Sequence, residues 1–215
     1  YNASGQADSS GAEKMYRSWS MLLSSLKLGF VKPSKIIFTT PEQNRLQQQI
    51  DEALRQEIAS VNAVDRIFIM GSASRQAMGR YQTPFVHGKL VKLGSDVDIL
   101  VEINQGREGD IPDSWHCINP VASNHCAVYH LGQIPLSGGA EAWAKQYPNV
   151  EFTHHLIDAY VFFPSRGYQE EKDAFLHKFG ARIYYDRSRD GIIPRNAELK
   201  ELTGQIAQFY PLEQI

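Results

Sequence analysis

An apolar run with two carboxylates at its start, residues 95–103, limits the possible folds of this chain more than any other segment. Asp96 and Asp98 stand two residues apart, and the Ile-Leu-Val that follows favours a β-strand. Because side chains alternate along a strand, both carboxylates are expected on one face, where they repel each other. A bound cation relieves that repulsion. Mg²⁺ is favoured, because it takes one or two carboxylates together with phosphate oxygens.

A second motif precedes this strand. The apolar run 67–70 is followed by Gly71-Ser72 and a helix-compatible stretch to Met78, which indicates a strand, a tight turn and a helix. Glycine lets the backbone approach a ligand closely, and the N–H groups at the start of a helix attract anions. The predicted phosphate-binding residues are Gly71, Ser72, Ser74 and Arg75.

These two motifs, in residues 71–75 and 95–101, resemble the signature of the nucleotidyltransferase superfamily typified by DNA polymerase β. The resemblance implies a minimal nucleotidyltransferase domain that transfers a nucleoside monophosphate from a nucleoside triphosphate to a hydroxyl acceptor, with release of pyrophosphate. It implies two Mg²⁺ ions, with Mn²⁺ as a substitute, and a third carboxylate on a later strand. Residues 155–163 form an apolar run with a single acid. The expected catalytic and metal-binding residues are Asp96, Asp98 and Asp158.

Composition fits an ordinary globular protein. With 215 residues, 42% of them hydrophobic, the chain is long enough for one core, so a single domain is expected over residues 12–215 after a disordered segment 1–11. A net charge of −2 gives no basic excess for broad nucleic-acid binding. No apolar run approaches the ~20 residues of a membrane span. Two cysteines favour a reducing compartment, and we expect a cytoplasmic protein without a membrane partner.

The expected architecture is α/β of the α+β type, a mixed, mostly antiparallel sheet flanked by helices, with the catalytic core at about residues 41–190. Apolar residues at helical spacing predict helices at residues 12–26, 41–60, 168–179 and 196–209, and a short helix at 140–146. Thr40 and Gln43 are predicted to cap the second helix. Phe175, Leu176 and Phe179 are expected to point inward. A strand is predicted at 181–186.

Other segments are less informative. Residues 81–94 are predicted to form a cationic loop, either solvated or facing the substrate. Residues 104–148 are rich in Gly, Pro, Ser and Asn and allow little prediction. Within them, His116-Cys117 and His125-Cys126 contain zinc-ligand types, but their spacing matches no common zinc motif, and packing or surface roles are expected.

The acceptor stays open: a small molecule, RNA, a protein or a second nucleotide is compatible with these motifs, and a helical partner domain or a second copy of the chain is a possible partner. Two other functions fit the same residues. One is transfer of pyrophosphate from ATP, as in alarmone synthetases, which share the implied fold. The other is a nucleotide-binding regulator or interaction module without turnover. Retention of three acids favours an enzyme.

Overall fold

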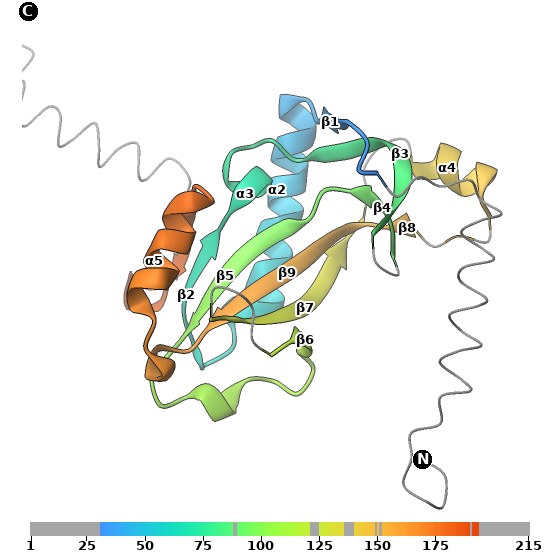
Figure 1. The fold of residues 1–215 in the computed structure, drawn as a ribbon. Coiled ribbons are helices and arrows are strands. Elements are labelled where there is room, and N and C mark those ends of the chain that lie inside the picture. Colours follow the sequence, from blue (N-terminus) through green and yellow to red (C-terminus); the bar gives the residue numbers. More distant parts are fainter. Residues whose placement is uncertain are drawn as a thin grey trace, which may run out of the picture.

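The computed structural model describes residues 31–87, 90–120, 125–135, 140–148, 150, 152–189 and 191–193 (Figure 1). The segment 1–11 and the helices predicted at 12–26 and 196–209 lie outside these residues.

A seven-stranded sheet forms the centre of the described structure, in the order β11-β10-β2-β5-β9-β7-β6 (Figure 1). Only β5 and β9 pair in parallel, and the other neighbours are antiparallel. The mixed, mostly antiparallel α+β architecture predicted from the sequence is therefore confirmed. Its strands are β2 (Val64–Ile69), β5 (Val97–Ile103), β6 (His116–Asn119), β7 (Ala127–Ile134), β9 (His155–Phe162), β10 (Arg182–Asp186) and β11 (Gly191–Ile192).

A second sheet of four strands contains the segment that was predicted to be a loop. Its order is β1-β3-β4-β8, with β1 (Lys35–Ile37), β3 (Gly79–His87), β4 (Leu90–Gly94) and β8 (Phe152–Thr153). The loop prediction for residues 81–94 is wrong, because β3 and β4 pair with each other and bury Phe85, Val91 and Leu93. The cationic residues of this segment suggested a loop, but its apolar side chains are buried and stabilise the pairing of β3 with β4.

Helix α2 (Thr40–Leu54) continues into a π-helical turn, Arg55–Ala59, which confirms the helix predicted at 41–60. Its cap lies one residue earlier than predicted. Thr39 is the N-cap, and its backbone N–H donates to Glu42 Oε2 at 2.8 Å. Gln43 instead is buried and donates from Nε2 to the Met78 carbonyl at 2.7 Å. The glutamine therefore joins α2 to the segment before β3.

The two faces of the large sheet are covered by different helices. Ile99 and Val101 pack in one cluster with Leu46 and Ile50 of α2. Leu100 lies in a second cluster, against which Phe175 and Leu176 of helix α5 (Gln169–Lys178) pack. Because side chains alternate, Asp98 lies on the face of Leu100. The carboxylates are therefore on the sheet face opposite α2.

Two further predicted elements, a short helix and a strand, are present in the structure. Helix α4 has the predicted bounds, Ala140–Gln146, and β10 occupies the strand predicted at 181–186. Phe179 was expected to be buried with Phe175, but it is 39% exposed because it lies past the end of α5. Short 3₁₀ turns complete the described chain: η2 (Glu108–Asp110), η3 (Pro164–Arg166) and η4 (Arg187–Arg189).

Candidate functional site

The three predicted acids come together on the parallel strand pair. Asp98 of β5 and Asp158 of β9 are register partners, and Asp96 immediately precedes β5. Burial raises the pKa of Asp98 to about 6, and the negative charges of Asp96 and Asp158 add to the shift. The high pKa of Asp98 therefore reflects its burial first and the neighbouring carboxylates second. This strand pairing brings Asp158, sixty residues later in the chain, to the Asp-Val-Asp motif.

Asp96 is neutralised in part by a lysine from the second sheet. Lys92 of β4 is 7% exposed, and its Nζ donates to Asp96 Oδ2 at 2.7 Å. The other oxygen, Asp96 Oδ1, is buried and has no hydrogen-bond partner among the described residues. Buried carboxylate oxygens are normally satisfied by a donor or a cation. Asp96 therefore has one oxygen bound by the protein and one oxygen left for another ligand.

Asp158 faces a histidine that the sequence did not single out. His130 of β7 is the register partner of Asp158, and its Nδ1 lies 3.3 Å from Asp158 Oδ1. His130, Asp158 and Asp98 thus form one row across three adjacent strands. Burial and the charge of Asp96 raise the pKa of Asp158, and the hydrogen bond with His130 lowers it. No local pattern marks His130; only the pairing of β7 with β9 brings it to the site.

The glycine turn lies directly beside the acids. Gly71 has a φ of +62°, and a Cβ at this position would be 3.3 Å from Asp98 Oδ2. The two sequence motifs are therefore neighbours in space. The following helix α3 (Gly71–Ser74) is shorter than the predicted stretch to Met78, because Gln76 takes a left-handed conformation with a φ of +53°.

The four predicted phosphate-binding residues have different surroundings. The backbone N–H of Gly71 donates to the Phe179 carbonyl at 3.1 Å. Ser74 is buried, and its hydroxyl lies 2.8 Å from the Gly180 carbonyl, so it ties the turn to the end of α5. Ser72 Oγ contacts Met78 Sδ at 3.1 Å. Arg75 is exposed and makes one long contact, from Nη1 to the Phe179 carbonyl at 3.5 Å. Arg75 and Ser72 are thus the side chains best placed to meet a ligand.

Two lysines near β1 were missed by the sequence analysis. The pKa of Lys32 is raised by a hydrogen bond with Tyr81 and further by the charges of Asp96 and Asp98. The pKa of Lys35 is lowered by burial and by the nearby charges of Lys32 and Arg75. Lys35 Nζ donates to the Ala77 carbonyl at 2.7 Å. A positive group therefore lies beside the acids, and it is assembled by the pairing of β1 with β3.

The donor set suits a hard cation such as Mg²⁺, which prefers carboxylate oxygens. The free Asp96 Oδ1 and the raised pKa of Asp98 are the observations that support this fit. Across the described ranges, no group of three or more His, Cys, Asp or Glu side chains is already arranged to hold a metal ion. Lys92 and His130 each engage an oxygen that such an ion would use. Each contact occupies one oxygen of its carboxylate, so a metal ion could bind Asp96 through the free Oδ1 while Lys92 keeps Oδ2.

The His-Cys pairs lie apart from these acids in the fold. Cys126 is buried with Leu100 and Phe162, whereas His116 and Cys117 are exposed on β6. The ring of His125 stacks on Tyr168, with 3.8 Å between the ring centroids. These positions agree with the packing and surface roles expected for them.

Comparison with family models, with curated proteins and with solved structures gives no match to this chain. The likeness to nucleotidyltransferases rests on the motif residues alone. Within the described ranges, no helix has the length and apolar character to cross a membrane.

Proposed function

We propose that this chain has a nucleotidyltransferase fold and transfers a nucleoside monophosphate from a nucleoside triphosphate to a hydroxyl acceptor in a Mg²⁺-dependent reaction. The observation that carries the proposal is the register of Asp98 with Asp158 on adjacent parallel strands, with Asp96 just before and Gly71 alongside. A structural role for three crowded acids is less favourable, because their mutual repulsion raises the free energy of the folded state.

In this reaction the acceptor oxygen attacks the α-phosphorus, the bond from that phosphorus to the bridging oxygen breaks, and pyrophosphate leaves. Asp96 and Asp98 would hold both metal ions, and Asp158 one of them. Bound Mg²⁺ supplies stabilisation of the charge that develops on the attacking and leaving oxygens. Asp158 accepts the acceptor proton, and its raised pKa improves it as a base. His130 fixes the orientation of that carboxylate.

The cationic side chains would bind the leaving pyrophosphate. Arg75 carries a guanidinium that suits phosphate oxygens, and Ser72 adds a hydroxyl. Lys32 adds positive charge next to the acids, and Lys35 adds positive charge near Arg75. Positioning and electrostatic stabilisation supply most of the catalysis in phosphoryl transfer. Residues of these types are therefore enough for the proposed reaction.

The test is release of pyrophosphate from each labelled triphosphate with Mg²⁺ and with cell extract as the source of acceptor. Wild-type protein is expected to release pyrophosphate and to move label onto an acceptor. Asp158→Asn is expected to bind nucleotide normally and to lose turnover by several orders of magnitude, because it removes the proton acceptor. Asp113→Asn, an exposed acid away from the site, is the matched control and should keep full turnover. Release of AMP from ATP without pyrophosphate would instead indicate pyrophosphate transfer.

One observation favours a second candidate function, a nucleotide-binding regulator without turnover. Lys92 and His130 already engage Asp96 and Asp158 in the protein alone, as protein groups do where no metal is needed. Such a regulator would bind triphosphate through Arg75 and release no product. Wild-type binding without turnover, unchanged in Asp158→Asn, would establish this second function.

A further inference from the structure

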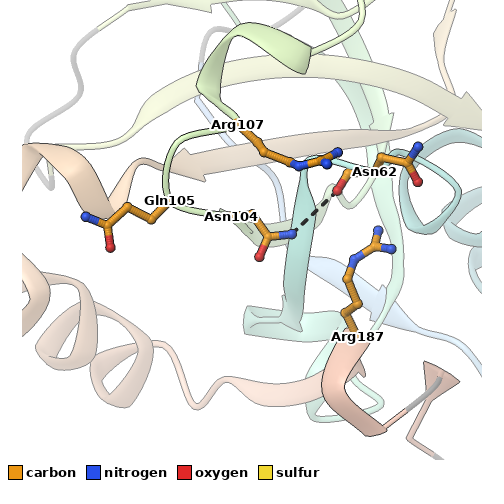
Figure 2. Close-up of a pocket in the computed structure, with 5 residues that line it drawn as sticks. All are labelled: Asn62, Asn104, Gln105, Arg107 and Arg187. Carbon is orange, nitrogen blue, oxygen red and sulfur yellow. Dashed lines mark hydrogen bonds between the residues drawn. The ribbon is translucent and has the colours of Figure 1, made fainter.

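A polar cavity of about 520 Å³ lies at the far end of β5 from the acids. Its lining residues come from three places in the fold: the turn before β2, the segment after β5, and the start of η4. They are Asn62, Asn104, Gln105, Arg107 and Arg187. In Figure 2, the guanidinium groups of Arg107 and Arg187 lie on either side of the contact between Asn104 Nδ2 and the Asn62 carbonyl, which measures 3.5 Å.

Every lining residue carries a hydrogen-bond donor, and none is a carboxylate. Arg187 is held by two backbone carbonyls: its Nε donates to Val64 at 2.7 Å and its Nη2 to Val61 at 2.8 Å. Those neutral acceptors fix the guanidinium without cancelling its charge. No carboxylate in the described ranges forms an ion pair with Arg187. The cavity therefore presents a fixed positive charge.

Arg107 supplies a second positive charge, on a side chain that is held only weakly. Its Nη1 lies 3.5 Å from Asp110 Oδ2, and both side chains are more than half exposed, at 52% and 56%. An exposed pair of this kind is weak, since water screens it, so a stronger anion replaces the aspartate readily. Together the two guanidinium groups match a phosphate monoester, which carries a charge of about −1.5 to −2, better than a single carboxylate.

We propose that this cavity is a binding site for a small molecule that carries a phosphate group, separate from the acids on β5 and β9. About six residues of extended strand separate Asp98 from Asn104, or roughly 20 Å at ~3.3 Å per residue. One ligand cannot have the same phosphate at both places. The volume exceeds that of phosphate itself, and the amides of Asn62 and Asn104 would bind polar groups of the rest of the ligand.

The test is calorimetry on the full chain in EDTA, so that metal-dependent binding at the acids does not contribute. The probes are inorganic phosphate, pyrophosphate and a nucleoside 5′-monophosphate, which separate recognition of phosphate alone from recognition of a larger ligand. At least one probe is expected to bind, and more weakly at high salt. Arg107→Gln should lower the affinity about tenfold or more, the loss of one charge-assisted hydrogen bond. Arg107 is exposed, so this variant should fold normally.

Two controls locate the binding. Arg189→Gln removes an exposed arginine of η4 that does not line the cavity, and it should leave the affinity unchanged. Arg75→Ala tests the other end of the sheet and should leave intact the binding that Arg107→Gln weakens. The proposal is overturned if none of the probes binds, if Arg75→Ala removes the binding, or if Arg107→Gln retains it. Binding of an oligonucleotide but of none of the three probes would also overturn it, in favour of a nucleic-acid surface.

Discussion

Asp96 and Asp98 carry the same functional group but have different surroundings. From the sequence, removal of either acid is expected to relieve repulsion and to leave the stability of the metal-free protein unchanged or slightly raised. In the structure, Asp96 is the partner of the buried Lys92, whereas Asp98 forms no ion pair within the described residues. The two substitutions should therefore change stability in opposite directions.

Asp98→Asn should stabilise the metal-free protein at neutral pH. The pKa of Asp98 is about 6 when folded, against an ordinary value of 3.8, so the folded state holds the proton more tightly. The free energy of unfolding then falls as pH rises from about 4 to 6 and stays lower above that range, by about 2–3 kcal/mol. The asparagine variant should lose this part of the pH dependence in urea unfolding. Asp113→Asn should keep it, and an unchanged slope in Asp98→Asn would contradict the assigned pKa.

Asp96→Ala should destabilise the metal-free protein by roughly 1–3 kcal/mol, because it leaves the Lys92 ammonium buried without its carboxylate. Replacing both partners, as Lys92→Met with Asp96→Ala, should recover much of that loss. Unfolding of the two single variants and the double variant gives the coupling free energy. If the losses of the single variants simply add, the 2.7 Å contact does not contribute to stability in solution.

At the scale of elements, the local sequence pattern was enough to predict a helix or strand where the spacing of apolar residues decides the structure. It identified β2, β5, β9 and β10 as strands and α2, α4 and α5 as helices. It failed for β3 and β4, whose lysines and histidine made the buried apolar face hard to recognise, and for β6 and β7, which lie in the segment rich in Gly, Pro, Ser and Asn. His130 and Lys92 belong to these missed strands. The acids were thus predictable from sequence, and the protein groups that contact them were not.

Helix α5 offers a test of how an element supports the site. Lys172 is 1% exposed, and its Nζ lies 3.1 Å from Glu102 Oε2 of β5, which anchors the helix to the sheet. The carbonyl of Phe179, just past the helix, accepts the backbone N–H of Gly71. Glu102 keeps a second partner, Arg66 Nη2 at 2.9 Å, so Lys172→Ala should lower the free energy of unfolding by less than the roughly 3–5 kcal/mol expected when a buried charge loses its only partner. It should also weaken triphosphate binding.

The matched control for that helix variant is Lys178→Ala, which removes an exposed lysine from the last turn of α5. It should leave unfolding and nucleotide affinity close to wild type. Thermal melts measure the first effect and calorimetry with a triphosphate the second. Normal affinity in a folded but destabilised Lys172→Ala protein would show that the glycine turn keeps its place without α5.

At the scale of the whole molecule, the net charge of −2 does not describe how charge is distributed, because the two ends of the sheet carry different charged groups. Three acids with Lys32, Lys35 and Arg75 occupy one end of β5, and a cavity with two arginines and no acid in its lining occupies the other. The field at each end, rather than the total, determines which ligands approach. The carboxylate end suits a metal ion with a polyphosphate, and the arginine end suits an anion without metal.

Mg²⁺ should stabilise the whole protein in a pH-dependent way. A metal ion binds the ionised carboxylates, so it competes with the proton on Asp98, whose pKa is about 6. At about pH 7.5, Mg²⁺ at 100 times its Kd should raise the free energy of unfolding by about 2.7 kcal/mol. The effect should be much smaller at about pH 5, where Asp98 is mostly protonated. Asp98→Asn should lose it at both pH values, whereas Arg107→Gln, at the other end of the sheet, should retain it. Melting curves with Mg²⁺ and with EDTA measure the shift; equal stabilisation of wild type and Asp98→Asn would place the metal somewhere other than at these acids.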